Sequence, residues 1–292
     1  MILKKKKINK LKMSKMKNIF LCFILFSLFF ITTFTLSASR TLDDKLKIMC
    51  IGDSITDGYG TDGSYRKFLY HFLVSDGYSI DMVGPNGSWG DTEYINGDEK
   101  FTYNPAHCGF SGYTIKTYAG RNGILETIKN GDYLSEYKPD LIILQIGTND
   151  VIDNHEIETA GKRLKDLVDY ILSNVKSDCL IFITTIPNLD PNRQDVYTWF
   201  SNYRHSDDWS TKYDDEDVFK NVQKVVDNYN NQVKEVVEKI NKEGNENVHF
   251  GDINSVITDV KTQLKDGVHP NNIGYKLMGE YWYKVLLPYM KK

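Results

Sequence analysis

The amino-acid sequence predicts an α/β fold of three layers, an α/β/α sandwich built on a parallel sheet of about five strands. From about residue 45 onward, short apolar runs alternate with longer amphipathic segments, the pattern of a sheet covered by crossover helices. Two of these runs, LIILQI at 141–146 and CLIFITTI at 179–186, are apolar throughout rather than alternating. Continuous apolar runs are typical of strands buried on both faces.

The elements follow in order along the chain. Strands are predicted at 45–51, 79–83, 141–146, 179–186 and 247–251, and helices at 64–75, 157–175, 218–240 and 271–287, where apolar residues recur at helical spacing. Two polar, aromatic-rich stretches, 84–108 and 188–217, fit neither pattern, and loops of that length are often functional. Since no repeat or linker divides residues 40–292, they are predicted to form one domain.

Residues 1–39 have the pattern of a secretory signal peptide. Eight lysines and no acidic residue occur before Ser39, residues 18–36 are almost entirely apolar, and small residues follow at 37–39. We expect cleavage after Ser39 and a secreted protein without stable membrane association. The alternative is an uncleaved membrane anchor, since about nineteen apolar residues can just span a bilayer.

Loss of this leader changes the charge of the chain. It removes eight of the 36 Lys and Arg residues and none of the 39 Asp and Glu residues, so the net charge moves from −3 to −11. Such a chain, with no basic stripe, is not expected to bind nucleic acid. Three cysteines remain, Cys50, Cys108 and Cys179, without a C-x-x-C pair, so neither a disulfide framework nor a zinc site is predicted. A single bridge stays open, the oligomeric state is not predicted, and no metal or cofactor is expected.

Residues with hydrolytic chemistry follow the predicted strands. Ser54 comes after the first strand, Asn149 after the third, and Asp266 and His269 precede the last helix. In an open parallel sheet the ligand lies at the carboxyl ends of the strands, where these residues should meet. There His269 can take the proton of the Ser54 hydroxyl, while Asp266 holds the other ring nitrogen.

A developing oxyanion needs several converging donors, which the N–H groups of Ser54 and Gly112 and the side-chain amide of Asn149 can supply. A glycine at 112 also leaves room for an acyl group. Each residue has a simpler explanation taken singly: serine and asparagine cap helices, and His269 precedes a helix-starting proline. Their joint occurrence, in order and at the same end of the sheet, favours a serine hydrolase.

A competing motif overlaps the serine. Gly58, Gly60 and Gly63 spell G-x-G-x-x-G, and Asp81 follows at nearly the interval of a dinucleotide site. In such a site, however, the first glycine stands at the end of the strand, a place that Gly52 occupies here. We therefore expect these glycines to form the loop around Ser54. The G-x-S-x-G elbow of α/β-hydrolases is also absent around Ser54.

The segments GDSITDG, GFSGYT, GTND and DGVHP resemble the four blocks of the GDSL/SGNH hydrolase superfamily. That resemblance implies a flavodoxin-like fold, with Ser54 as nucleophile, Gly112 and Asn149 as oxyanion donors, and His269 as the base oriented by Asp266. KIMCIGDSITDG, GSYRKFLYHFL and GFSGYTI further resemble the family 3 carbohydrate esterases, which deacetylate xylan. Phe110 departs from the G-H-S-G sequence typical of related second blocks.

The resulting expectation is a secreted serine esterase that removes O-acetyl groups from plant polysaccharide of the acetylxylan type, through an acetyl-serine intermediate. Its partner would be an acetylated polysaccharide or oligosaccharide. The alternatives are a lipase, lysophospholipase or arylesterase of the same superfamily, and a non-catalytic carbohydrate-binding protein. The presence of both Ser54 and His269 disfavours the last of these.

Overall fold

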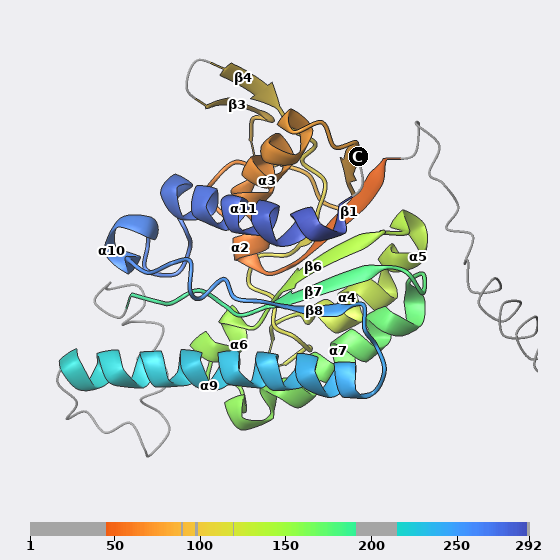
Figure 1. Ribbon diagram of the computed structural model, residues 1–292. Coiled ribbons are helices and arrows are strands. Elements are labelled where there is room, and N and C mark those ends of the chain that lie inside the picture. The colour runs from red at the N-terminus through yellow and green to blue at the C-terminus, as the bar shows by residue number, and fades with distance from the viewer. Residues whose placement is uncertain (1–44, 89, 97–98, 119, 191–214, 291–292) are drawn as a thin grey trace, which may run out of the picture. The chain divides into compact units, whose positions relative to one another are not determined.

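Five parallel strands form the centre of the fold (Figure 1). The computed structural model describes residues 45–88, 90–96, 99–118, 120–190 and 215–290. The strands are β1 (Leu46–Gly52), β2 (Ile80–Met82), β6 (Leu141–Gln145), β7 (Leu180–Thr184) and β8 (Val248–Gly251), in the order β2-β1-β6-β7-β8. This confirms the predicted fold class, and each of the five predicted strands is present.

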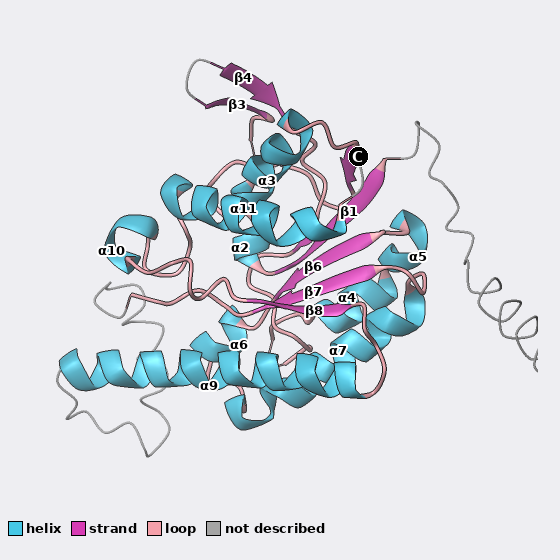
Figure 2. Cartoon of the chain, viewed as in Figure 1, coloured by secondary structure: helices cyan, strands magenta, loops and turns pink. Residues whose placement is uncertain are grey.

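Helices cover both faces of the sheet (Figure 2). One face carries α3 (Ser64–Ser75) and α11 (Asn272–Leu286), and the other α4 (Ile124–Asn130), α5 (Tyr133–Tyr137), α7 (Ala160–Asn174) and α9 (Asp215–Lys242). Alternate residues of β1 enter different cores: Ile48 and Cys50 pack with α3 and α11, whereas Met49 and Ile51 pack with α4, α7 and α9. Burial on both faces explains why the central strands are apolar throughout.

Several short elements are additional to the predicted ones. They are the short helices α4 and α5, the one-turn helices α2 (Ser54–Asp57), α6 (Thr148–Ile152) and α10 (Val260–Gln263), and the 3₁₀ turns η1 (Ile157–Thr159) and η3 (Leu287–Tyr289). The predicted helix 157–175 thus begins as the 3₁₀ turn η1 and continues as α7. The helices α2 and α6 matter most, because each begins where a central strand ends.

The stretch 84–108, predicted as a loop, contains regular structure. An antiparallel hairpin joins β3 (Glu93–Asn96) to β4 (Glu99–Thr102), and the two-residue strand β5 (Cys108–Gly109) pairs with the end of β1. Most of the second long stretch, 188–217, lies outside the described residues, as does the predicted leader. Of the helices that the structure describes, none combines the length and apolarity that a membrane crossing requires.

All three cysteines of the described part of the chain are buried free thiols. Burial raises the pKa of the Cys50 thiol to about 11 and, with help from nearby Asp140 and Asp178, that of Cys179 to about 12. Burial also raises the pKa of Cys108. These side chains therefore stay protonated and pack as small apolar groups.

Candidate active site

The candidate nucleophile stands at a sharp turn between a strand and a helix. The strand β1 ends at Gly52, and Ser54 is the first residue of α2. Asp53 caps this helix, its Oδ1 accepting the N–H of Ile55 at 3.0 Å. Gly58, with φ of +87°, ends it after one turn. This cap helps to fix Ser54 at the carboxyl end of the central strand.

Asp266, His269 and Ser54 form one chain of hydrogen bonds. Asp266 Oδ2 lies 2.8 Å from His269 Nδ1, and His269 Nε2 lies 2.8 Å from Ser54 Oγ. The other oxygen of Asp266 accepts the N–H groups of Val268 at 3.1 Å and His269 at 2.8 Å, which makes the turn rigid. Ser54 and His269 are buried, whereas Asp266 is partly exposed. The series of hydrogen bonds therefore runs from the protein surface to the buried Ser54 hydroxyl.

The electrostatics of Asp266 fix the histidine tautomer. Burial by itself would raise the pKa of Asp266, but the hydrogen bonds from the His269 side chain and backbone lower it to about 2. Asp266 is thus ionised and can only accept hydrogen bonds, so the His269 Nδ1 atom must carry a proton. In the neutral imidazole this leaves Nε2 free to accept the proton of Ser54 Oγ.

The two other predicted residues complete the site. Asn149 lies in the first turn of α6, with Nδ2 donating to the Tyr113 carbonyl oxygen at 2.8 Å. Gly112 has a φ of +81°, and a Cβ atom there would approach only Arg121 Nη1, at 3.6 Å. Its left-handed backbone conformation is thus a reason for glycine besides room for the acyl group. All five predicted residues, Ser54, Gly112, Asn149, Asp266 and His269, line one cavity of about 420 Å³.

Asp150 has a structural role in the site that the sequence did not reveal. Its Oδ2 accepts the N–H of Ile115 at 2.9 Å, and its Oδ1 accepts from Arg163 Nη2 at 3.2 Å. Burial raises the pKa of Asp150 to about 6, against the opposing effect of these hydrogen bonds. Asp150 therefore ties the loop that carries Gly112 to the helix that carries Asn149. Its place directly after Asn149 is the one signal in the sequence, and helix capping would explain an aspartate there equally well.

Arg121, like Asp150, holds the loop that carries Gly112 in place. Its Nη1 donates to the Gly112 carbonyl oxygen at 3.1 Å, and its Nη2 donates to Asp153 Oδ1 at 2.8 Å. The Arg121 Nε atom also donates to Asp153 Oδ2. Arg121 lines the cavity with the predicted residues. No local pattern identifies it, because it lies in a polar loop between Gly120 and Asn122.

A buried neutral histidine, His107, holds the backbone just before the Gly112 loop. His107 Nδ1 accepts the N–H of Gly109 at 3.0 Å, and its Nε2 donates to the Gly87 carbonyl oxygen at 2.8 Å. Burial, reinforced by the nearby charge of Arg66, lowers the pKa of His107 to about 3. The 3.6 Å approach of Asp57 Oδ1 is therefore not an ion pair at neutral pH. Asp57 instead accepts the Ser111 hydroxyl, at 2.5 Å.

The competing glycine motif forms the turn between α2 and α3. Gly58, Gly60 and Gly63 have φ angles of +87°, +65° and +69°, a conformation that favours glycine. Asp81, the would-be ribose ligand, accepts a hydrogen bond from Asn104 Nδ2 at 2.7 Å. Within the described residues, no group of His, Cys, Asp and Glu side chains could hold a metal ion.

The Tyr59 ring lines the cavity beside His269. The Tyr59 ring lies 5.1 Å from the His269 ring at an angle of 41°, and 48% of Tyr59 is exposed. The Lys265 ammonium lies 4.9 Å from the centre of the Tyr59 ring. Ile152 and Val268 are the aliphatic side chains of the lining, the rest being polar apart from Tyr59 and Gly112.

Comparison with known proteins identifies a family and several similar proteins. Residues 48–282 match the family of GDSL-like lipases and acylhydrolases. The chain is 40% identical over 252 residues to a multidomain esterase of Ruminococcus flavefaciens, a match that covers 84% of this chain and 29% of that relative. The structure resembles a family 3 carbohydrate esterase of Clostridium thermocellum, with a TM-score of 0.57 and 25% identity over 84% of this chain and 97% of the other. It also resembles a family 3 carbohydrate esterase of Talaromyces cellulolyticus, with a TM-score of 0.58 and 18% identity over the same shares of the two chains.

Proposed function

Because the chain belongs to the family of GDSL-like lipases and acylhydrolases, we propose that it removes O-acetyl groups from an acetylated plant polysaccharide of the acetylxylan type. The observation that carries this proposal is the hydrogen-bond chain from Asp266 through His269 to Ser54 at the cavity. The reaction proceeds through an acetyl-serine intermediate in two halves.

In the first half, Ser54 Oγ attacks the acetyl carbonyl carbon while His269 Nε2 takes its proton. Asp266 stabilises the imidazolium that results. The negative charge that develops on the carbonyl oxygen is met by the N–H groups of Ser54 and Gly112 and by Asn149 Nδ2. His269 then gives its proton to the sugar oxygen, the ester C–O bond breaks, and the acetyl group stays on Ser54.

In the second half, water replaces the sugar. His269 takes a proton from the water as it attacks the acetyl carbon, and the same three donors stabilise the second oxyanion. The proton returns to Ser54 Oγ, and acetate leaves. The clamps from Asp150 and Arg121 hold the Gly112 loop throughout, so the donors need no rearrangement between the two halves.

The lining of the cavity favours a short acyl group. A long acyl chain needs a continuous apolar surface, since each buried methylene contributes about 0.8 kcal/mol. Here the aliphatic side chains among the described lining residues are limited to two, Ile152 and Val268. Tyr59 adds a partly exposed aromatic ring to the lining, the kind of surface on which a sugar ring can pack.

The names of the relatives support a carbohydrate substrate. Two similar structures are family 3 carbohydrate esterases, and the relative with 40% identity is a multidomain esterase. Because the chain spans only 29% of that relative, we carry over the class of reaction and not the activity of the whole protein.

Acetate release tests the proposal. Acetylated xylan and an aryl octanoate are offered in parallel to the wild-type protein and to Ser54→Ala. We expect the wild type to release acetate from xylan, with little turnover of the octanoate, and the Ser54→Ala variant to release none. Preferential hydrolysis of the octanoate would instead place the substrate among lipids or simple esters and overturn the acetylxylan proposal.

We also propose that the enzyme acts outside the cell. The support is the basic and apolar pattern of residues 1–39, which lie outside the described structure. Mass spectrometry of protein recovered from the medium of an expressing culture should find an N-terminus at Arg40. Protein retained in the membrane fraction with an intact leader would contradict cleavage.

A further inference from the structure

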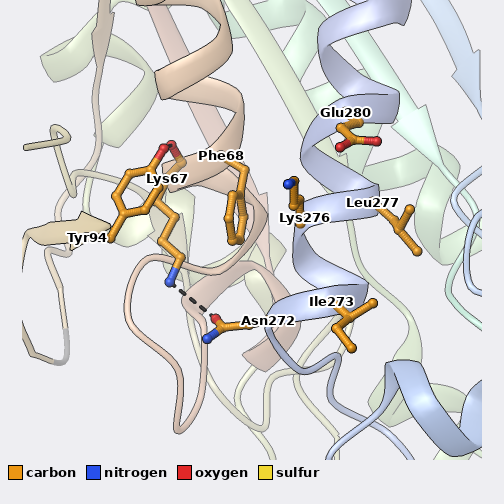
Figure 3. Close-up of a pocket in the computed structure, with 8 residues that line it drawn as sticks. All are labelled: Lys67, Phe68, Tyr94, Asn272, Ile273, Lys276, Leu277 and Glu280. Atoms are coloured by element: carbon orange, nitrogen blue, oxygen red, sulfur yellow. Dashed lines mark hydrogen bonds between the residues drawn. The ribbon is translucent and has the colours of Figure 1, made fainter. Parts of the chain in front are cut away.

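A second groove lies where the β3–β4 hairpin meets α3 and α11 (Figure 3). Its volume is about 620 Å³, larger than that of the active-site cavity. The two share no lining residue. The groove is lined by Lys67 and Phe68 of α3, Tyr94 of the hairpin, and Asn272, Ile273, Lys276, Leu277 and Glu280 of α11.

Lys67 is an unusual component of this groove. Only 6% of the residue is exposed, yet its ammonium makes one hydrogen bond in the described structure, to Asn272 Oδ1 at 3.3 Å. Within the described residues, no carboxylate oxygen lies within 4.0 Å of Lys67 Nζ. An ammonium has three N–H donors, and a buried cation without a close anion is costly. Burial accordingly lowers the pKa of Lys67, although nearby Asp62 opposes the effect.

Aromatic rings give Lys67 partial compensation. Its Nζ atom lies 5.1 Å from the centre of the Phe68 ring and 5.7 Å from that of the Tyr94 ring. Such cation–π contacts are weaker than a charge-assisted hydrogen bond to a carboxylate. The Lys67 ammonium can therefore still bind an anion that lies in the groove.

The remaining lining suggests what kind of anion fits. Lys276 adds a second positive charge from α11, against a single negative charge from Glu280. Tyr94 is partly exposed, and 58% of Ile273 is exposed, which is high for a large aliphatic residue. A ligand that carries a carboxylate on a saturated ring with an apolar C–H face would satisfy both the charges and these surfaces.

We propose that this groove binds a uronic acid residue of an acidic polysaccharide, with its carboxylate between Lys67 and Lys276 and its sugar ring against Tyr94. The inference rests on the proposed function, because it assigns an acidic side group to the polymer that the enzyme deacetylates. The net negative charge of the chain does not prevent such binding, since charges farther away than about 8 Å are largely screened at physiological ionic strength.

Binding measurements on the full-length Ser54→Ala variant test the proposal without turnover. Isothermal titration calorimetry compares a xylo-oligosaccharide that carries one glucuronic acid with the neutral oligosaccharide of the same length. We expect the acidic ligand to bind about tenfold more tightly, the factor that one charge-assisted hydrogen bond supplies. The preference should shrink as salt is added.

Two substitutions locate the binding site. Lys276→Gln, at an exposed position, and Lys67→Met should each remove most of the preference for the acidic ligand. Lys284→Gln, on the same helix and outside the groove, should leave it intact. Equal affinity for the two ligands, or a preference that survives Lys276→Gln, would overturn the proposal whether or not Lys67→Met folds.

Activity separates this proposal from the proposed function. In proteins that retain Ser54, the substitutions at Lys67 and Lys276 should leave aryl acetate hydrolysis unchanged and raise KM for uronate-bearing acetylated xylan. Failure of the wild type to release acetate from any xylan, with uronate binding intact, would refute the acetylxylan proposal and not the groove.

Discussion

At the level of single residues, the Asp266 carboxylate determines which nitrogen of His269 can act as a base. It holds the ring through Nδ1 and the turn through two backbone N–H groups. An asparagine at this position keeps the size of the side chain but loses the charge, and its amide can also donate a hydrogen bond to Nδ1. That hydrogen bond would favour the opposite tautomer of His269, in which Nε2 and not Nδ1 carries the proton.

Asp266→Asn should therefore lower kcat for an aryl acetate by about 10²–10⁴, with a small change in KM. Steady-state kinetics between pH 6 and 9 measure the effect. Asp259→Asn is the matched control, because Asp259 is an exposed helix cap and asparagine also caps helices. More than half of the wild-type kcat in Asp266→Asn would contradict the assigned role.

Asn149→Ala should lower kcat by about 10²–10³, the usual effect of removing one oxyanion donor. Because the donor matters most in the transition state, kcat should fall more than KM changes. The same kinetics on Asn174→Ala, at an exposed site on α7, provide the control. An effect confined to KM would indicate that Asn149 only positions the substrate.

At the level of elements, the site depends on how closely β1 approaches β6. Gly52 pairs with Gln145, and a Cβ atom at Gly52 would lie 2.1 Å from the Gln145 carbonyl oxygen. This contact is with backbone, so no side-chain rotation can relieve it. The strand end that presents Ser54 must then shift away from the strand end that leads to Asn149.

Gly52→Ala should lower the free energy of unfolding by about 1–3 kcal/mol or more, as overpacking usually does. Urea unfolding followed by circular dichroism measures it. Gly87→Ala serves as the control, since a Cβ atom there meets nothing within 4 Å. Equal midpoints for Gly52→Ala and the wild type would show that the strands can separate without cost.

At the level of the whole molecule, two buried groups give stability an opposing dependence on pH. The pKa of His107 is about 3 in the fold and 6.5 ordinarily, so below pH 6.5 the unfolded chain binds the extra proton and stability falls. The pKa of Asp150 is about 6 in the fold and 3.8 ordinarily, so between these values the folded protein holds the extra proton and stability rises as the pH falls.

Substitution of the histidine separates the two effects. His107→Gln should be less stable than the wild type at pH 7.5, because it loses well-placed buried hydrogen bonds. The difference in the free energy of unfolding between the two proteins should narrow toward pH 4, by up to about 1.4 kcal/mol per pH unit. Only the wild type is destabilised there, because only its unfolded chain has a histidine at 107 that binds a proton. Unfolding curves at several pH values measure it, and parallel dependences in the two proteins would refute the assignment of a buried neutral His107.

What the sequence could predict depends on how far apart along the chain the interacting residues lie. The five strands and the long helices are visible in local apolar patterns, and the order of the motifs placed Ser54, Asn149 and His269 at one end of the sheet. The β3–β4 hairpin was missed because its short strands, EYIN and EKFT, lack a clear apolar alternation. Arg121 and the tether from Asp150 were missed because their roles arise from contacts 32 and 35 residues apart.

The central claim is that Ser54 carries the acetyl group between the two halves of the reaction, and acid-quenched mass spectrometry tests it most directly. The protein is mixed with excess aryl acetate, quenched within its first turnovers, digested with a protease and sequenced by fragmentation. We expect one acetyl group on the peptide that contains Ser54, located at that residue and absent from Ser54→Ala. Acetylation of another residue during turnover, or undiminished turnover by Ser54→Ala, would contradict it.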